Sequence, residues 1–478
     1  MPHSLLIRNG YVLSLDPQVG DIERGDVLVQ DGRIVEVAPS LDVGDAEVIE
    51  AEGHVVMPGF VDTHRHTWQT ALRAVCADWT LSQYFLGVRS TLSPRYDPDD
   101  VYAGNYVGAL EALDAGVTTV LDFSHCNVTP SHADAAVQGL RDAGLRAVFA
   151  YGYFAPPAAE PGFADHAARV ADARRVQREH FPSADGLVTM GIAITETGLI
   201  PFEDSRTEVL SARELGVPLV AHTGCAWGTQ VTMGVREFAA HGLLGPDQIH
   251  VHCNSLSDHE FDLLVRNDCK VSSSPESELQ MGMGHPVIGR CLDRGVKPSL
   301  SCDVVSLNSG DMFTQMRLGL QFQRAMDNDP LLARGEDPIE LRLTVRDALG
   351  WATVNGAEAM GLGSVCGTLT PGKQADLIVV GGDRLNMLPL SEPAAAMVVQ
   401  ANAANVRDVL VAGRAVKRDG QLVGVDTRRL RRLIDDSRER VFARVLADGP
   451  ILPEPPAGML EAMDTLSRTN LAAAWAQS

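Results

Sequence analysis

Residues 55–66 read VVMPGFVDTHRH, an apolar run that ends abruptly in charged and imidazole side chains. Residues 55–61 have the length and composition of a buried strand. His64 and His66 follow this run and are separated by one residue, so both imidazoles point to the same side of an extended segment. Such a pair can reach one metal ion at about 2.0–2.1 Å. The stretch therefore predicts a central strand with a metal site at its end.

Seven further apolar runs follow, and helical patterns lie between several of them. The eight runs cover residues 55–61, 117–123, 147–151, 188–194, 218–221, 249–251, 270–272 and 297–301. Alternation of strand and helix implies parallel pairing, and eight such units predict an α/β fold, a (β/α)8 TIM barrel. A doubly wound sheet is the alternative, but no Gly-rich phosphate-binding loop follows the first run.

The two ends of the chain differ in texture from its middle. The first part shows short strand patterns separated by tight-turn dipeptides such as Asn9-Gly10 and Asp31-Gly32. A similar pattern returns at residues 372–416, and we predict one small β-sandwich built from both pieces. The expected division assigns residues 1–57 and 365–424 to the sandwich, 58–364 to the barrel and 425–478 to a helical extension.

The composition is that of a globular protein with an acidic surface. Of 478 residues, 45% are hydrophobic, and 40 Lys and Arg against 62 Asp and Glu give a formal net charge of −22. This charge argues against a nucleic-acid partner or an anionic membrane surface. The eight cysteines form no Cys-x-x-Cys pair and are expected to be reduced. With no leader-like start and no apolar stretch of ~20 residues, we expect a cytoplasmic protein.

Three more strand ends carry residues of the same chemistry. His222 follows the fifth run, His252 the sixth and Asp303 the eighth. In a parallel barrel the carboxyl ends of all strands meet at one rim, where reactive residues gather. Each residue alone fits a hydrogen-bonded rim position or a helix cap, but their joint occurrence on four strands predicts a metal site. Imidazoles with one carboxylate suit a divalent borderline metal, Zn²⁺ or Fe²⁺, and we expect Zn²⁺ more than Fe²⁺.

Several stretches resemble the amidohydrolase superfamily, in particular its cytosine deaminase-like branch, which includes triazine and S-adenosylhomocysteine aminohydrolases. The matching stretches are MPGFVDTHRH at 57–66, AGVTT at 115–119, HCNSLSD at 252–258, SPES at 274–277, DMF at 311–313 and GTLTPGKQADL at 367–377. The resemblance covers about residues 1–420. It implies that His64, His66, His222 and Asp303 hold one metal, and that His252 contacts the substrate or the attacking water.

The fourth run indicates how many ions the site holds. Two-metal members of the superfamily bridge their ions with a carbamylated Lys at this strand end, whereas here residues 190–197 read MGIAITET. One metal is therefore expected, with a Glu196 bridge between two ions as the alternative. The unrelated zinc deaminases require a Pro-Cys-x-x-Cys motif, which this sequence lacks.

The expected chemistry is addition of metal-activated water to an sp² carbon, with Asp303 accepting the water proton and His252 orienting the water. Deaminases of this branch carry a proton-shuttling Glu three residues after the strand-five His, but here that position is Cys225, a poor replacement. Further candidate substrate contacts at the rim are Gln69, His125, Glu196, Cys225, Glu276 and Glu278.

These features predict a mononuclear metal-dependent amidohydrolase that cleaves a C–N bond of a small nitrogen heterocycle. Deamination, amine release and opening of a cyclic amide all fit this prediction. One alternative is hydrolytic dehalogenation, which does not need the missing Glu, and another is a non-catalytic metal-binding scaffold. The only partner expected is a small-molecule substrate, and a homo-oligomer is compatible with the sequence.

Overall fold

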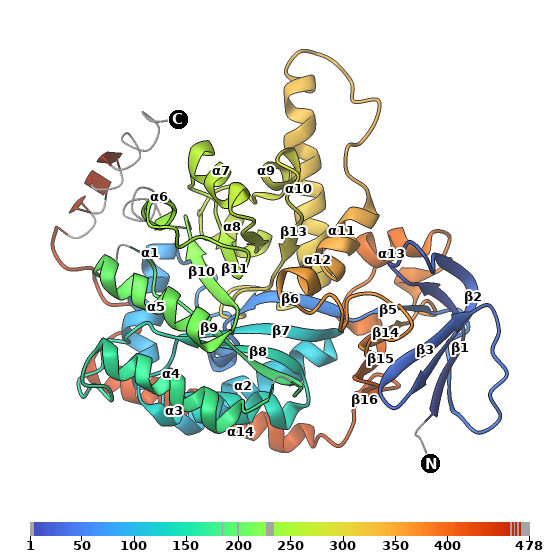
Figure 1. Ribbon diagram of the computed structural model, residues 1–478, viewed down its shortest axis with the longest axis horizontal. Coiled ribbons are helices and arrows are strands. Elements are labelled where there is room, and N and C mark those ends of the chain that lie inside the picture. The colour runs from blue at the N-terminus through green and yellow to red at the C-terminus, as the bar shows by residue number, and fades with distance from the viewer. Residues whose placement is uncertain are drawn as a thin grey trace.

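A computed structural model describes residues 4–183, 185–197, 200–225 and 234–458, together with 461, 462, 464, 465, 468 and 469. Its centre is an eight-stranded parallel barrel (Figure 1). The barrel strands are β6 (Phe60–Arg65), β7 (Val117–Ser124), β8 (Arg146–Gly152), β9 (Val188–Ala193), β10 (Leu219–Thr223), β11 (Gln248–His252), β12 (Lys270–Ser273) and β13 (Pro298–Leu300). The predicted barrel is thus confirmed.

The barrel closes between its last strand and its first one. The ladder runs in chain order from β6 to β13, and a short bridge pairs Arg65 with Asp303 just beyond β13. The Asp303 amide donates to the His64 carbonyl at 2.9 Å, and the His66 amide donates to the Asp303 carbonyl at 2.9 Å. The seam of the barrel therefore lies at the predicted metal ligands.

Helices surround the barrel on its outer side (Figure 1). They include α2 (Pro98–Asp114), α3 (Pro130–Ala143), α4 (His166–His180), α5 (Phe202–Leu215), α6 (Val235–Ala240), α7 (Asp258–Arg266), α8 (Pro275–Gln280), α9 (Ile288–Asp293), α10 (Met312–Leu332), α11 (Val345–Trp351), α12 (Val354–Ala359) and α14 (Thr427–Asp448). Capping residues fix several starts: the Asp311 side chain accepts from Thr314 N at α10, and Ser257 forms a capping box with Glu260 at α7.

Strands from both chain ends form one mixed sheet beside the barrel, as predicted. Its members are β1 (Ser4–Leu13), β2 (Asp21–Gln30), β3 (Arg33–Ala38), β4 (Glu47–Glu50), β5 (Val55–Pro58), β14 (Leu377–Val380), β15 (Val406–Val411), β16 (Arg414–Arg418) and β17 (Gln421–Leu422). One apolar cluster contains Ile34 of β3 and Leu410 of β15, so distant parts of the sheet enclose a shared core. Helix α13 (Pro393–Val399) follows β14.

The first apolar run belongs to two sheets, which corrects the single strand expected at residues 55–61. β5 pairs with β14 in the small sheet, and the barrel strand begins only at Phe60. Gly59 lies between the two strands and packs tightly, because a Cβ atom there would lie 2.2 Å from the Thr118 side chain. Two adjacent β segments around Pro58-Gly59 therefore replace one long strand.

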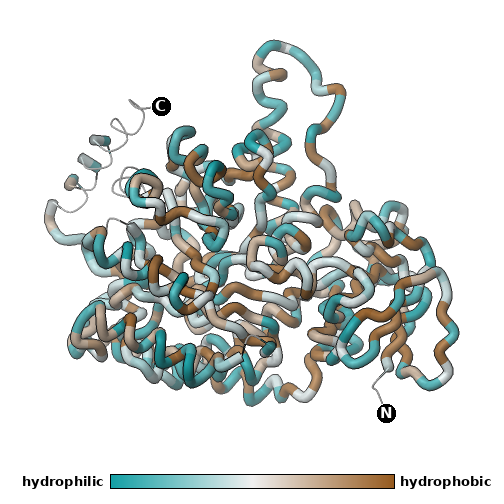
Figure 2. The backbone as a smooth tube through the Cα atoms, viewed as in Figure 1, coloured by the Kyte–Doolittle hydropathy of each residue, from teal (hydrophilic) through white to brown (hydrophobic). Residues whose placement is uncertain are grey.

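Hydrophobic segments concentrate along the inner strands, and polar segments are frequent on the outer helices (Figure 2).

Helix α14 returns along the barrel to pack against α2, where its Arg440 and Arg444 reach the buried Asp100 carboxylate at 2.7 Å each. Among the described residues, no helix combines the length and apolar character needed to cross a bilayer.

Candidate active site

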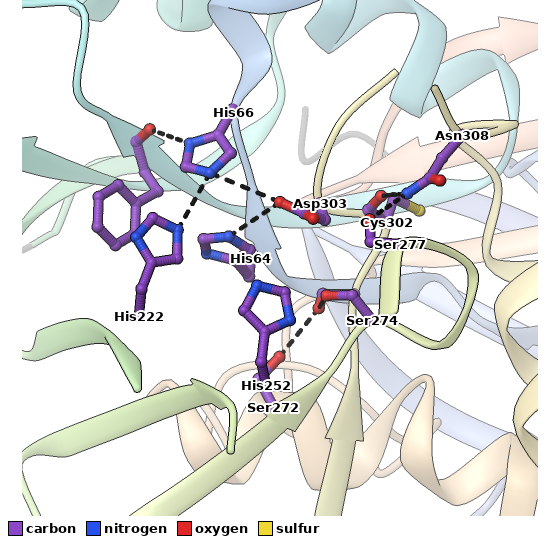
Figure 3. Close-up of polar contacts among 12 residues, drawn as sticks. His64, His66, His222, His252, Ser272, Ser274, Ser277, Cys302, Asp303 and Asn308 are labelled. Atoms are coloured by element: carbon purple, nitrogen blue, oxygen red, sulfur yellow. Dashed lines mark hydrogen bonds and ion pairs between the residues drawn. The ribbon is translucent and has the colours of Figure 1, made fainter. Parts of the chain in front are cut away.

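Four side chains predicted as metal ligands converge at the seam of the barrel (Figure 3). The Asp303 Oδ1 atom lies 3.2 Å from His64 Nε2 and 3.5 Å from His66 Nε2. His66 Nε2 and His222 Nε2 lie 3.2 Å apart. The ligand atoms of His64, His66 and Asp303 are all within 4.8 Å of one another, as are those of His64, His222 and His252.

The donor set fits a divalent metal cation. Both ring nitrogens of His64 are buried without a hydrogen-bond partner, which is costly unless another group binds them. Burial lowers the pKa of His64 to about 4 and lowers the pKa of His66, so these rings are neutral at pH 7 and can act as ligands. Burial disfavours the Asp303 carboxylate, but its contact with His64 outweighs this and lowers the pKa of Asp303.

Hydrogen bonds at Nδ1 turn three of the imidazoles towards the centre. His66 Nδ1 lies 2.9 Å from the Phe123 carbonyl, and His222 Nδ1 lies 2.9 Å from Glu196 Oε1. His252 Nδ1 lies 3.2 Å from Glu278 Oε1. In each ring the Nε2 atom is thereby left for a metal or a substrate, which is the common arrangement of acceptors behind histidine ligands.

Buried Arg89 supports the Glu196 carboxylate. Its Nη1 atom lies 2.7 Å from Glu196 Oε1 and its Nη2 atom 3.3 Å from Oε2, while the guanidinium stacks 3.8 Å from the centre of the Phe154 ring. Burial disfavours the charged carboxylate, but Arg89 and His222 outweigh it and lower the pKa of Glu196. The chain thus stabilises an ionised acceptor directly behind a candidate metal ligand.

The backbone at two site residues adopts the left-handed conformation. His252 has φ 75° and Asp303 has φ 59°, and Cys253 follows His252 with φ 59°. Non-glycine residues rarely adopt such values, and they are found preferentially at functional sites. At Asp303 the conformation is held by the two backbone hydrogen bonds that close the barrel and by the Asn308 side chain, which donates to the Cys302 carbonyl at 2.8 Å.

A small cavity of about 20 Å³ lies beside this cluster. Its described lining consists of His66, Leu81, Tyr84, Phe85, Arg89, Glu196, His222, Cys225, His252, Met281, Met283, Asp303 and Val304. The lining combines the polar metal-ligand residues with the apolar side chains of Leu81, Phe85 and two methionines. A mixture of apolar residues and a few polar groups is typical of small-molecule sites.

Two candidate contacts from the first half of the barrel lie behind the cavity wall. His125 stacks on His66, with ring centres 4.0 Å apart, and its Nδ1 accepts from Trp68 Nε1 at 3.0 Å. The Gln69 amide accepts from Ser306 Oγ at 2.8 Å and donates to Tyr84 Oη at 2.5 Å. Neither residue is among the described residues that line the cavity.

The two glutamates after β12 are also engaged within the protein. Glu278 is fully buried and accepts from Ser273 Oγ at 2.8 Å and Ser274 N at 2.7 Å, in addition to its contact with His252. Glu276 accepts from Gln315 Nε2 at 2.9 Å and from Ser309 Oγ at 3.0 Å. Among the described residues, the cavity lining contains neither carboxylate.

Cys225 lines the cavity where the proton-shuttling Glu of the resembled deaminases would be expected. Burial raises the pKa of its thiol, and the Glu196 carboxylate raises it further, so the sulfur keeps its proton at neutral pH. Tyr84 and Arg89, in contrast, were not singled out from the sequence. They lie between β6 and α2, in α1 (Leu81–Tyr84) and in η2 (Phe85–Leu92), where no motif or regular periodicity marks them.

Comparison with known proteins assigns the chain to a protein family. The sequence model of the amidohydrolase family matches residues 55–416. The chain belongs to the amidohydrolase family. The resemblance noted from the sequence is thereby confirmed, and the match spans the whole barrel and the return to the small sheet.

Relatives of this amidohydrolase include several deaminases. It is 29% identical to 5'-deoxyadenosine deaminase of Methanothermobacter thermautotrophicus over 430 residues, which covers 87% of this chain and 95% of the relative. It is 28% identical to 5-methylthioadenosine/S-adenosylhomocysteine deaminase of Symbiobacterium thermophilum, with 87% and 94% of the two chains covered.

Solved structures show the same fold as this amidohydrolase. An adenosine deaminase from Xanthomonas campestris with bound zinc matches with TM-score 0.80 at 25% identity and covers 92% of this chain and 99% of its own. A zinc complex of atrazine chlorohydrolase from Arthrobacter aurescens matches with TM-score 0.79 at 21% identity and covers 91% and 100%. Family, relatives and the His/Asp groups together show a hydrolase that acts on carbon–nitrogen bonds and carries a metal-binding site.

Proposed function

We propose that this amidohydrolase deaminates a 6-aminopurine nucleoside or a similar amino-substituted nitrogen heterocycle, with one zinc ion held by His64, His66, His222 and Asp303. The observation that carries the proposal is the convergence of these four buried side chains beside a cavity lined by both polar and apolar residues. The names of the deaminase relatives support the substrate class. The zinc in the related adenosine deaminase structure supports the metal.

Each residue then has a definite role in the reaction. When bound, the cation lowers the pKa of a water molecule towards ~7 and so supplies a nucleophile near neutral pH. Asp303, which is kept ionised by the imidazoles around it, accepts a proton from that water. His252, held through Nδ1 by Glu278, presents Nε2 to orient the water or to stabilise charge at the attacked carbon.

The position of Cys225 bears on which leaving group departs. A thiol whose pKa is raised by burial cannot shuttle a proton as a carboxylate does. The nearby Glu196 carboxylate is already bound by Arg89 and His222. A reaction that needs no such shuttle, such as hydrolytic removal of halide, is therefore the second candidate function.

A substrate panel scored separately for ammonia and halide tests the proposal. The purified protein, stripped by a chelator and reloaded with Zn²⁺ or Fe²⁺ in parallel, is assayed with adenosine-type, cytosine-type and chlorotriazine compounds. We expect ammonia from an aminopurine and the higher rate with zinc. Halide release without any ammonia release would overturn deamination in favour of the second candidate.

Substitution of metal ligands provides the matched test of the site. We expect His64→Ala and Asp303→Ala to lose bound zinc and all turnover while the circular dichroism spectrum stays that of a folded protein. His285→Ala removes an exposed imidazole and serves as the control, which should keep both zinc and rate. Full activity in either ligand variant would refute the assignment.

A further inference from the structure

One segment between β6 and α2 contributes several residues to the cavity lining. Thr80 starts α1 with a capping box, its side chain accepting from Gln83 N. The π-helical segment η2 continues it without a break, and such segments occur frequently at functional sites. Together they bring Tyr84, Phe85 and Arg89 to the cavity wall.

The hydroxyl of Tyr84 is held as a hydrogen-bond acceptor from within the protein. Ser306 Oγ donates to Gln69 Oε1 at 2.8 Å, and Gln69 Nε2 donates to Tyr84 Oη at 2.5 Å. Because this chain of hydrogen bonds has one direction, the Tyr84 proton is left for another acceptor. Among the described residues, no hydrogen bond from Tyr84 Oη uses this proton.

Other polar groups of the cavity wall are engaged in hydrogen bonds within the protein or are weak donors. Glu196 binds Arg89 and His222, and Arg89 directs two of its nitrogens back at that carboxylate. Cys225 offers only a thiol, which is a weak donor. Tyr84 is the neutral hydroxyl in the described wall, and its position beside a metal-ligand cluster suits a donor to a bound ring.

We propose that the Tyr84 hydroxyl donates a hydrogen bond to the substrate heteroatom next to the carbon that water attacks. This inference rests on the proposed function. As the water oxygen bonds to that carbon, the π electron pair moves onto the neighbouring ring nitrogen or oxygen, and the water proton passes to Asp303. Tyr84 stabilises the developing negative charge there and keeps its own proton, as a donor of an oxyanion hole does.

The surroundings keep Tyr84 in its donor form. Burial raises the pKa of the phenol well above its ordinary value, and Asp303 raises it further, whereas Arg89 opposes this rise. Tyr84 lines the same cavity as His66, His222 and Asp303. Gln69 is then a positioning residue, because it acts on the substrate only through Tyr84.

The decisive experiment removes one oxygen atom. Wild type, Tyr84→Phe and a control are compared as zinc-loaded enzymes in steady-state assays with the most active aminopurine. We expect Tyr84→Phe to lower kcat about 10²-fold, the loss typical of one oxyanion-hole donor, with unchanged zinc content and little change in KM. The control Tyr153→Phe removes a buried hydroxyl that contacts Ser211 at 2.8 Å and should match wild type.

A double-mutant cycle distinguishes positioning by Gln69 from a general packing role. Gln69→Ala should lower kcat less than Tyr84→Phe does, and the double variant should be no slower than Tyr84→Phe alone, because both changes remove one interaction. An unchanged kcat in Tyr84→Phe overturns the inference, as does a loss of zinc that accompanies the loss of rate. A wild type that releases no ammonia from any amine overturns the proposed function, and the inference falls with it.

Discussion

Two buried carboxylates orient imidazole rings of the candidate metal site. Glu196 and Glu278 are both buried, and each accepts at the Nδ1 side of one histidine, His222 and His252 respectively. Such acceptors fix the tautomer and the orientation of a ring and increase its basicity as a ligand. Two of the glutamates predicted as substrate contacts therefore contact side chains that line the cavity.

Substitution of Glu196 tests this arrangement. Glu196→Gln keeps the shape but removes the charge that holds Arg89 and orients His222. We expect the affinity for zinc to fall about 10- to 100-fold in a competition titration with a chromogenic chelator. Glu203→Gln, which changes a glutamate with 77% of its side chain exposed, is the control. Equal zinc affinity in Glu196→Gln and wild type would contradict the role given to this carboxylate.

Replacement of the cavity thiol should have a small effect. Cys225→Ala removes a group whose pKa is raised by burial and which therefore stays protonated. We expect kcat/KM to stay within a few-fold of wild type and alkylating reagents to leave the native protein active. A variant without activity that still binds zinc would show that the sulfur takes part in the reaction.

At the scale of elements, the passage from the small sheet to the barrel depends on Gly59. The chain leaves β5 at Pro58 and starts β6 at Phe60, and the Gly59 amide donates to the Asp376 carbonyl at 3.0 Å. The Thr118 side chain fills the space that any Cβ atom at position 59 would need. Close packing of this junction against Thr118 of β7 is therefore possible only with glycine.

A single added methyl group tests this junction. Gly59→Ala should destabilise the protein by about 1–3 kcal/mol through overpacking, measured by denaturant unfolding. Gly44→Ala places its methyl group in open space and should be neutral. Shortening the neighbour in Gly59→Ala/Thr118→Ala should recover part of the loss. Absence of any difference between the variants at positions 59 and 44 would refute the steric account.

Elements were predictable where hydrophobic periodicity and strand ends mark them. The four residues His64, His66, His222 and Asp303 could be found because each lies within a few residues of the end of an apolar run, in a barrel whose strands are all parallel. Tyr84 and Arg89 could not, since they lie on a short helix and a π-helical segment without amphipathic pattern. The break between β5 and β6 was missed because both pieces are apolar and adjacent, and only the tertiary pairing separates them.

For the whole molecule, α14 links the end of the described chain to the barrel. Asp100 of α2 is fully buried and accepts from Ser437 at 2.9 Å and from Arg440 and Arg444 at 2.7 Å each. Burial disfavours the charged carboxylate, but these hydrogen bonds outweigh it and lower the pKa of Asp100. A buried anion thus fixes a helix that lies more than 300 residues away in the sequence.

Neutralising this anion should loosen α14. We expect Asp100→Asn to lower the stability at pH 7 by about 1.5–3 kcal/mol, the range for hydrogen bonds to charged groups, with faster hydrogen exchange in α14. Because the pKa of Asp100 is lowered on folding, its contribution is fully present above the ordinary value near 3.9 and is lost as pH falls through the folded value.

The difference in stability between wild type and Asp100→Asn should therefore become smaller below about pH 4, as measured by thermal unfolding of the metal-free protein. Asp99→Asn changes the exposed neighbour on the same helix turn and provides the control. A stability difference that grows on acidification would show the opposite sign and rule out the ion-paired state.

The seam between β6 and the Asp303 segment also determines when the barrel can close during synthesis. His64 and Asp303 are separated by about 240 residues, yet their backbones hold the barrel shut. A ribosome adding roughly 5–20 residues per second needs on the order of 10–50 s to make that stretch. During this interval one edge of the nascent β6 strand is unpaired. His64 and His66 also lack the Asp303 carboxylate that they contact in the folded protein.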